Sequence, residues 1–179
     1  MAQVLSVSPV VRRRDTVAIA RRLLGCWLVV KVDGAWRAHR ISEVEAYDGP
    51  EDRACHASRG RTRRTEVMFA PGGVWYVYLI YGMHEMLNLV TGPADYPAAV
   101  LIRGVDGISG PGRLTRALGI DRRFNGRPAT RETGLFIEDD GFVVPEGEVR
   151  VTPRIGVDYA GPEWAGKPWR FVWEPGDTG

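Results

Sequence analysis

Two carboxylates stand two residues apart in the segment Glu43-Val44-Glu45-Ala46-Tyr47. Side chains at this spacing share one face of an extended strand, so Glu43 and Glu45 are expected to point the same way. A carboxylate beside a pocket can hold and deprotonate a water molecule, while the second one serves structural hydrogen bonding. On spacing alone, two solvated strand residues are the commoner outcome, so the pair gains meaning only from its surroundings.

Flat and partly polar rings occur close to this segment and in a second one. They are Tyr47, His56, Tyr76, Tyr78 and Tyr81. Such rings can sandwich a nucleobase, and each stack contributes roughly 1–3 kcal/mol. A tyrosine in a strand is more commonly a core residue, however, and a lone histidine is more commonly structural than catalytic. Both interpretations, a ring-lined binding pocket and an aromatic core, therefore stay open.

Positive charge is concentrated in the first third of the chain. Residues 1–65 contain 13 Lys or Arg against 7 Asp or Glu, whereas residues 66–179 contain 11 against 15. The densest run is Arg59-Gly60-Arg61-Thr62-Arg63-Arg64. A guanidinium fork binds phosphate through two hydrogen bonds, which makes this run a candidate phosphate-facing loop. The alternative is a solvated surface loop.

Other common chemistries lack their residue patterns here. The histidines His39, His56 and His84 have no paired ligand spacing, and Asn88 stands where a zinc-protease motif starting at His84 needs a histidine. The Gly-x-Gly at residues 110–112 lacks the downstream pattern of a dinucleotide site. No Ser/His/Asp arrangement is legible. We expect no metal and no other cofactor.

Length and composition indicate one globular domain. The chain has 179 residues, too few for two ordinary cores, and its 44% hydrophobic and 26% charged content is typical of a soluble protein. No apolar stretch is long enough for a membrane span, and Arg12-Arg13-Arg14 precede no signal-peptide core. We expect a cytoplasmic protein with no membrane partner. Cys26 and Cys55 are expected to be unpaired, buried small hydrophobes.

The elements that would position the carboxylates have clear signals. Asp15 is a typical N-cap for a helix over residues 16–24, which Gly25 would end. Residues 26–32 and 35–45 read as strands of a hairpin, because the Asp-Gly pair between them readily adopts positive φ. This places Glu45 at a strand end. Residues 51–58 could then make a short helix.

A second hairpin would carry the remaining rings. Residues 74–81 are aromatic and β-branched, and residues 84–90 can return as a partner strand, with Tyr81 near the tip. Alternation sends Tyr76 and Tyr78 to one face of the first strand. It sends the opposite-face residues to the core, and these are Val77 and Leu79.

The rest of the chain is also rich in strands. Residues 98–105 read as a buried strand, Gly110-Pro111-Gly112 leads into a basic helix, and late strands are expected at 135–138, 149–157 and 169–173. Few helices are long enough for parallel crossovers, which favours an α+β fold. We expect a single mixed domain over residues 1–179: a largely antiparallel curved sheet, a few short helices and a protruding hairpin. The ends, 1–14 and 174–179, are expected to fray.

Several ordered motifs resemble the alkyladenine (3-methyladenine) DNA glycosylase family. Residues 41–52, which read ISEVEAYDGPED, with Ala54-Cys55-His56, look like its catalytic signature. Residues 76–83, which read YVYLIYGM, with Asn88, look like its DNA-inserting hairpin. The pattern continues in the same order at residues 100–103, 109–114, 154–157 and 167–171. The resemblance covers residues 15–173 and is to the compact bacterial form.

The resemblance implies roles around an extruded purine. Glu45 would be the general base that positions and activates the attacking water, with Arg103 beside it. Tyr47 and His56 would stack on one side of the base and Tyr78 on the other. Asn88 would crowd the purine 2-amino position and so disfavour guanine. We therefore expect the Glu45 carboxylate to face a ring-lined cavity.

The resemblance also implies a surface for double-stranded DNA. Tyr81 would enter the minor groove and fill the gap left by the extruded nucleotide. Candidates for contact with the DNA backbone are Arg61, Arg64, Arg113 and Arg154. The family usually has Thr-Pro-Arg where this chain has Thr62-Arg63-Arg64, which raises the charge of the loop and leaves its geometry open.

The implied activity is that of a monofunctional glycosylase of base excision repair. Its substrates would be duplex DNA with purines of the 3-methyladenine, 7-methylguanine, hypoxanthine and ethenoadenine class. Electron-rich rings attract a purine made cationic by alkylation. Lys31 and Lys167 are remote from the motif in sequence, so water rather than an amine would attack, without strand cleavage. We expect a monomer, and a noncatalytic nucleic-acid-binding domain of the same fold is the alternative.

Overall fold

The computed structural model of the chain describes residues 3–4 and 15–176. Its helices are α1 (Thr16–Leu23), α2 (Pro111–Leu118) and α3 (Gly161–Ala165), with five short 3-10 helices between elements. Its strands are β1 (Gln3–Val4), β2 (Trp27–Val32), β3 (Ala35–Asp48), β4 (Trp75–Ile80), β5 (His84–Val90), β6 (Ala98–Val105), β7 (Ile108–Ser109), β8 (Leu135–Asp139), β9 (Val149–Thr152) and β10 (Arg170–Trp173).

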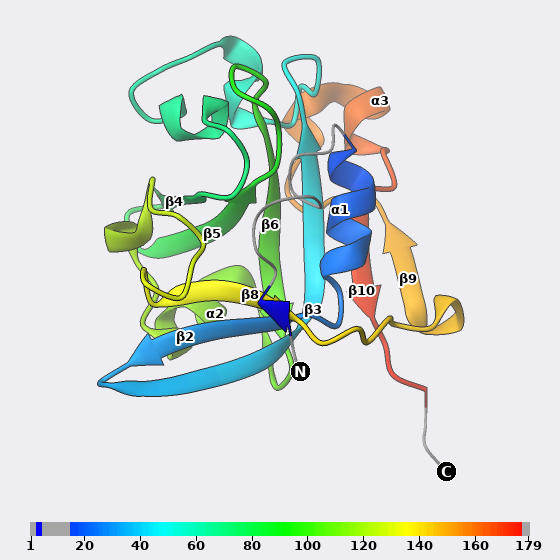
Figure 1. Ribbon diagram of the computed structural model, residues 1–179. Helices are drawn as coiled ribbons and strands as arrows, with labels where there is room; N and C mark the ends of the chain where they lie inside the picture. Colours follow the sequence, from blue (N-terminus) through cyan, green and yellow to red (C-terminus); the bar gives the residue numbers. More distant parts are fainter. Residues whose placement is uncertain (1–2, 5–14, 177–179) are drawn as a thin grey trace.

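The strands join in one ten-stranded sheet, and all their pairings are antiparallel. The main order is β1-β8-β2-β3-β6-β5-β4, while β10 adds to β3, β9 to β10 and β7 to β6 (Figure 1). With three short helices beside this sheet, the predicted α+β class and largely antiparallel sheet are confirmed.

The long strand β3 connects the two parts of the sheet. Its first half pairs with β2, and its second half pairs with β6 and β10. Register shifts around Glu43 form a bulge near this change of partners, and a bulge bends its strand. In Figure 1 the β2–β3 hairpin accordingly points away from the part where β3 lies between β6 and β10. Glu45 lies in that second half, inside the strand rather than at its end.

Helix α1, which the sequence pattern predicts, packs on β3. The Asp15 side chain accepts a 2.9 Å hydrogen bond from the backbone N–H of Ala18, which satisfies one free donor of the first turn. The buried face of the helix includes Ile19 and Leu23. Gly25 follows with a φ of 82°, a conformation in which glycine avoids a Cβ clash, and the chain turns into β2.

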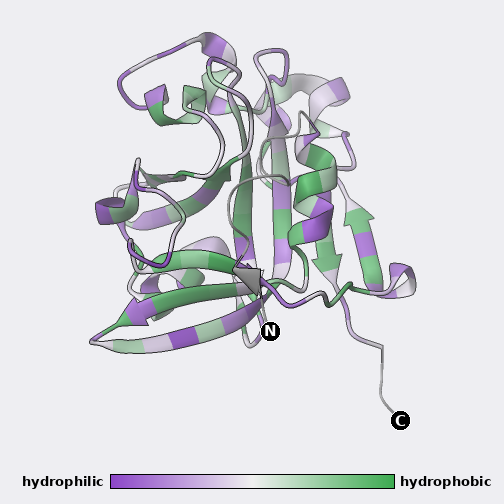
Figure 2. Ribbon diagram, in the orientation of Figure 1, coloured by the Kyte–Doolittle hydropathy of each residue, from purple (hydrophilic) through white to green (hydrophobic). Residues whose placement is uncertain are grey.

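The main hydrophobic core lies between the helices and the sheet. It joins residues from α1, α2 and the central strands, including Leu23, Val44, Leu87 and Leu114. Most of β6 has the colour of hydrophobic residues in Figure 2, and this central strand is buried along nearly its whole length. Cys26 and Cys55 are both buried and unpaired, which confirms their predicted role as small hydrophobes.

The second hairpin forms with the predicted strands. Its register runs from Trp75 opposite Leu89 to Ile80 opposite His84, and Tyr81 lies in the turn. Val77 belongs to the core as predicted. The prediction for Leu79 is wrong, because this side chain is only half-buried. It lies one residue before the end of β4, close to the exposed turn of the hairpin.

Two element predictions are wrong. Residues 51–58 form turns and the start of a 3-10 helix, His56–Arg59, instead of an α-helix. The Asp52 carboxylate accepts the N–H groups of Asp48 and Ala54 and so fixes a turn there. Strand β9 ends at Thr152 rather than at residue 157, because proline at 153 has no N–H to donate to a ladder.

The structure describes only part of the two ends that were expected to fray. Gln3–Val4 pair with β8, and Glu174 donates its N–H to the Glu148 carbonyl and forms an ion pair with Arg150. Residues 1–2, 5–14 and 177–179 lie outside the described residues. Among the described residues, no helix has the length and apolar character needed to cross a membrane.

Candidate active site

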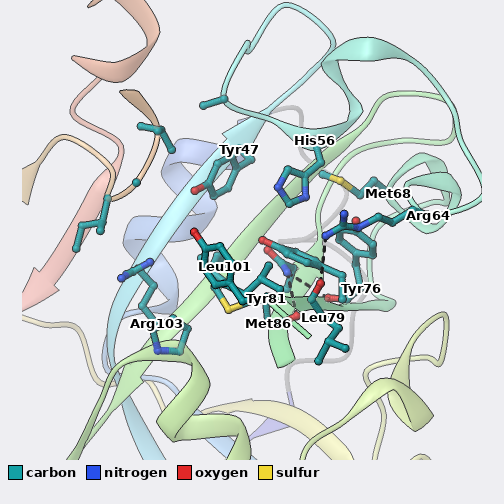
Figure 3. Close-up of a pocket in the computed structure, with 18 of the residues that line it drawn as sticks. Tyr47, His56, Arg64, Met68, Tyr76, Leu79, Tyr81, Met86, Leu101 and Arg103 are labelled. Carbon is teal, nitrogen blue, oxygen red and sulfur yellow. Dashed lines mark hydrogen bonds between the residues drawn. The ribbon is translucent and has the colours of Figure 1, made fainter. Parts of the chain in front are cut away.

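A cavity of about 520 Å³ opens between the β4–β5 hairpin, the end of β3, the residues around His56 and the segment 155–159. Its volume lies within the range of roughly 300–1,000 Å³ that is usual for small-ligand pockets. Figure 3 shows the ring of Tyr47, the ring of His56 and the side chain of Arg103 around the cavity. The predicted residues that line it are Tyr47, His56, Arg64, Tyr76, Tyr78, Tyr81, Asn88 and Arg103.

Strand pairing aligns one residue from each of three strands, β3, β6 and β5, across the sheet. Glu45 of β3 is opposite Leu101 of β6, and Leu101 is opposite Asn88 of β5. Directly opposed residues share a face of the sheet. Glu45, Leu101 and Asn88 therefore project to the same side, although 56 positions separate the first two in the chain. Val44, the neighbour of Glu45, projects to the other side and is buried in the core.

The Glu45 carboxylate lies immediately behind the cavity wall. Its side chain is 0% exposed and does not itself line the cavity, which corrects the expectation that it faces the open space. Its contacts do line the cavity: Tyr47 Oη donates to Oε1 at 2.9 Å, and Ile155 N–H donates to Oε2 at 2.7 Å. Arg103 Nη1 lies 3.5 Å from Oε1.

Burial and these donors act on the Glu45 charge in opposite directions. Desolvation raises the pKa of Glu45 above its ordinary value, and the Arg103 charge, the Ile155 N–H and the Tyr47 hydroxyl counteract this only in part. A carboxyl with a raised pKa is a stronger base when ionised. When ionised, this carboxylate can therefore act as a base toward a donor that reaches it.

Glu43 belongs to a structural ion-pair network. Its Oε1 accepts from Arg103 Nε at 3.0 Å and from Arg170 Nε at 2.7 Å, and both partners are largely buried. The two carboxylates thus meet at Arg103, which contacts one through Nε and approaches the other through Nη1. This division matches the expectation that one carboxylate of the pair serves structural hydrogen bonding.

The expected ring sandwich is not open in this structure. The centroids of the His56 and Tyr78 rings are 4.7 Å apart in an edge-to-face contact. A flat base between two rings needs about 3.5 Å on each side, so His56 and Tyr78 must separate before they can enclose one. Burial and the Arg64 charge lower the pKa of His56, which keeps its ring neutral at neutral pH.

Tyr76 and Asn88 form the inner wall. Tyr76 is 1% exposed and packs against Tyr78 with ring centroids 5.1 Å apart, within a small core cluster that includes Cys55 and Met68. For Tyr76 the aromatic-core interpretation therefore applies. Asn88 is also buried, and its amide nitrogen donates to the carbonyls of Tyr76 and Met86 at 3.2 and 3.3 Å. These bonds fix the carboxamide at the cavity wall.

Tyr81 lies at the exposed tip of the hairpin. It is 88% exposed and has a φ of 51°, so the turn rather than the core determines its position. Met83, two residues on, is 64% exposed. Two large apolar side chains thus project from one turn, and the sequence interpretation named only the first. The exposure of Met83 could have been predicted from its position in the expected turn.

The four arginines expected on the DNA backbone have different surroundings. Arg61 is half-exposed, pairs with Asp95 at 2.5 Å and lies over the Phe69 ring. Arg64 lines the cavity, with its guanidinium 5.3 Å from the Tyr78 ring centroid. Arg113 is exposed on α2. Hydrogen bonds between Thr62 and Thr65 close the loop that carries Arg63 and Arg64.

The expectation for Arg154 is wrong. Its side chain is 0% exposed and forms a bidentate ion pair with Asp52, whose side chain is also 0% exposed. A guanidinium enclosed on all sides by protein cannot reach a phosphate on the surface. Sequence shows the charge of Arg154 but not its acidic partner 102 positions away, so burial could not be predicted.

Of the lining residues that the sequence interpretation did not name, Ile155 and Tyr159 make hydrogen bonds at the site. Ile155 supplies the N–H that binds Glu45, and the residue as a whole is 49% exposed. Tyr159 is 63% exposed, and its hydroxyl donates to the Ala54 carbonyl at 2.7 Å. A backbone donor has no sequence signature. Among the described residues, no three His, Cys, Asp or Glu side chains gather into a group that could hold a metal.

The chain is similar to a known protein family over most of its length. The model of the methylpurine-DNA glycosylase (MPG) family matches residues 10–109 and 105–176. A protein of Myxococcus xanthus is 49% identical over 167 residues, which cover 88% of this chain and 84% of that protein. A protein of Anaeromyxobacter dehalogenans is 51% identical, covering 89% and 79%, and one of Bacillus cereus is 42% identical, covering 89% and 91%. All three carry the name "Putative 3-methyladenine DNA glycosylase".

Proposed function

This chain belongs to the methylpurine-DNA glycosylase family, and on that premise we propose that it is a 3-methyladenine DNA glycosylase of base excision repair. It extrudes a damaged purine from duplex DNA and hydrolyses the bond between base and sugar with a water that Glu45 activates. The observation that carries the proposal is the fully buried Glu45 carboxylate behind the wall of an aromatic cavity.

Extrusion comes first, because a glycosidic bond inside a duplex is out of reach of a buried carboxylate. Unstacking and unpairing a nucleotide costs a few kcal/mol, and least for a damaged or mispaired base. Tyr81, exposed at the tip of the hairpin, occupies the gap in the stack. The cavity opens beside this tip, so the extruded base has a short path into it.

Rings then hold the base. Tyr47 and His56 stack on one side and Tyr78 on the other, after His56 and Tyr78 move apart from their present edge-to-face contact. An alkylated purine carries positive charge, which the faces of such rings attract. The buried carboxamide of Asn88 crowds the 2-amino group of guanine and disfavours it.

Hydrolysis follows at the anomeric carbon of the sugar. Glu45 accepts a proton from water, the water oxygen bonds to that carbon, and the electron pair of the broken C–N bond goes to the purine. An alkylated, cationic purine leaves as a neutral base. Arg103 and the Ile155 N–H hold the carboxylate in place during proton transfer.

Attack by an amine is disfavoured by where the lysines lie. Lys31 is on β2 and Lys167 precedes β10, where it lies over the rings of Trp164 and Trp169. Neither lysine lines the cavity, whereas a lysine Schiff base would need the lysine amine at the sugar. The products are a free base and an abasic site in an intact strand.

The proposed substrates are duplexes with purines of the 3-methyladenine, 7-methylguanine, hypoxanthine and ethenoadenine class. Neutral lesions such as hypoxanthine are poorer leaving groups and depend more on the pocket. Arg61, Arg64 and Arg113 are the proposed contacts to the DNA backbone, and the enzyme acts in the cytoplasm as a monomer.

The test is a single-turnover excision assay with a metal chelator present. The protein is incubated with alkylated duplex DNA, released bases are separated by chromatography, and strand breaks are scored before and after alkali. We expect 3-methyladenine release and strand breaks only after alkali. Glu45→Gln should bind the damaged duplex but release its base at least about 100-fold more slowly, as for loss of a general base. Glu146→Gln, a change in a surface ion pair, is the matched control.

Binding without release by folded wild-type protein would instead support a noncatalytic nucleic-acid-binding domain. Strand breaks without alkali would contradict the monofunctional mechanism. Excision by Glu45→Gln at the wild-type rate would remove Glu45 from the role of base.

A further inference from the structure

We infer that Arg154 is a positioning residue for the proposed reaction, acting from its buried pair with Asp52. It fixes three chain segments relative to one another: the end of β3, residues 48–56, and residues 153–159. All three contribute to the wall around Glu45. The inference rests on the proposed function, because what it assigns to Arg154 is the placing of the proposed base and its ring.

The pair has the geometry of a rigid joint. Nη1 donates to Oδ2 of Asp52 at 2.7 Å and Nη2 to Oδ1 at 2.9 Å, with both side chains wholly buried. Desolvation offsets much of the attraction within a buried ion pair, so such a pair adds little net stability. Its two parallel hydrogen bonds nevertheless fix distance and orientation between the segments that carry the partners.

The first segment held is the end of β3. Arg154 Nη1 also donates to the Ala46 carbonyl at 2.9 Å, and the guanidinium carbon lies 4.8 Å from the centre of the Tyr47 ring. The ring proposed to stack on the base, whose hydroxyl binds Glu45, therefore rests on Arg154.

The second segment is the turn that leads to His56. The carboxylate of Asp52 accepts the N–H of Asp48 at 3.0 Å and the N–H of Ala54 at 3.1 Å, so the acid that binds Arg154 also folds this turn. Moving Asp52 would move the backbone two to four residues away. His56 begins the 3-10 helix directly after this turn.

The third segment follows Arg154 itself. The next residue, Ile155, donates its N–H to Glu45 Oε2 at 2.7 Å, so the fixed guanidinium also fixes the backbone that carries this donor. Nη2 donates further to the Trp164 carbonyl at 3.1 Å, and the Trp169 ring lies 5.0 Å away. Arg154 does not line the cavity, and so it acts through its neighbours.

The variants Arg154→Lys and Arg154→Met separate position from charge. Lysine keeps the positive charge but lacks the fork, whereas methionine keeps the length and loses both. We expect kcat for excision to fall by about 100-fold in Arg154→Met, a size typical of small misplacements at a site, with KM little changed. Arg154→Lys should recover only a small part of this loss.

The pH profile supplies a readout that a purely structural role would leave unmoved. The Tyr47 hydroxyl and the Ile155 N–H both lower the pKa of Glu45, as does the Arg154 charge. Losing their geometry should move the acid limb of kcat to higher pH in both variants. An acid limb that stays at the wild-type pH, or wild-type kcat in Arg154→Lys, would overturn the inference.

A matched control is Arg40→Met. Arg40 also forms a bidentate pair, with Asp140 at 3.0 and 2.8 Å, and it lies over the rings of Trp27 and Phe142, but away from the cavity. We expect Arg40→Met to lower the unfolding midpoint without moving kcat or the acid limb. If Arg154→Met does not fold, Asp52→Asn weakens the same pair while keeping the Arg154 charge, and it should also lower kcat; wild-type kcat in Asp52→Asn would overturn the inference.

A carboxyl titration by NMR separates this inference from the proposed function. Wild-type protein that excises no base would contradict the function, while the titration of Glu45 in wild-type and Arg154→Lys protein would still test the positioning. We expect the Glu45 pKa to be higher in Arg154→Lys than in wild-type protein. Equal values would overturn the inference whatever the excision assay shows.

Discussion

The Tyr47 hydroxyl donates a 2.9 Å hydrogen bond to Oε1 of Glu45, two residues earlier on the same strand face. The same ring lines the cavity and rests on the Arg154 guanidinium. One tyrosine thus connects the proposed binding surface to the proposed base. Because its hydroxyl favours the ionised carboxylate, changes at Tyr47 should alter the pH dependence of catalysis as well as binding.

Tyr47→Phe should move the acid limb of excision to higher pH. The substitution keeps the ring but removes a donor that lowers the pKa of Glu45, so the carboxyl stays protonated, and inactive as a base, to a higher pH. The measurement is kcat for 3-methyladenine release across pH. Tyr96→Phe, which removes a hydroxyl that donates to Asp48 at 3.2 Å, is the control and should leave the limb in place. An unmoved limb in Tyr47→Phe would show that this hydrogen bond does not tune Glu45.

Glu45→Gln should stabilise the fold above the ordinary pKa of a glutamate. Burial raises the pKa of Glu45 in the folded state, so the folded protein binds this proton more tightly than the unfolded chain. The contribution of this bound proton to the free energy of unfolding is complete below the pKa of Glu45 in the unfolded chain. It is lost as the pH rises through the higher pKa of Glu45 in the folded protein. Thermal unfolding midpoints should therefore be higher for Glu45→Gln than for wild type near pH 8, and the difference should shrink in acid. A lower midpoint at pH 8 would show that the charge stabilises the site.

Tyr81→Ala should impair excision from duplex DNA without weakening the fold. The side chain is 88% exposed, so the unfolding free energy should change by no more than about 0.5 kcal/mol. Losing part of the compensation for extrusion should lower the excision rate about tenfold, equivalent to about 1.4 kcal/mol. A fluorescent base next to the lesion would report extrusion directly. Val143→Ala, at another exposed apolar residue, is the control, and equal extrusion by Tyr81→Ala would exclude the wedge role.

Arg64→Ala should weaken DNA binding about equally for all sequences and reduce the slope of log affinity against log salt by about 1, as for one lost phosphate contact. Arg37→Ala, at an exposed position on the β2–β3 hairpin, should leave the slope unchanged. Binding would be followed by fluorescence anisotropy at several salt concentrations. Arg64 also lies over Tyr78, so an unchanged slope with slower excision would assign it to the cavity instead of the backbone.

Much of the local structure was determined by the sequence alone. The cap at Asp15, the Asp-Gly turn and the alternating strands predicted α1 and both hairpins, because these signals depend on residues within a few positions of each other. The family could also be recognised from sequence, because its motifs are short stretches of consecutive residues. Tyr81 could be placed at a hairpin tip because turn chemistry is local.

Only the tertiary structure decided what the charged residues do. Strand register sets Glu45 opposite Leu101, which in turn lies opposite Asn88. The sheet also brings Glu43 to Arg170, 127 positions away. Arg154 has a side chain of the kind that contacts DNA phosphates, yet it is buried in an ion pair with Asp52. The effect of a charge depends on its solvent exposure and its partner, and both come from contacts between segments far apart in the chain.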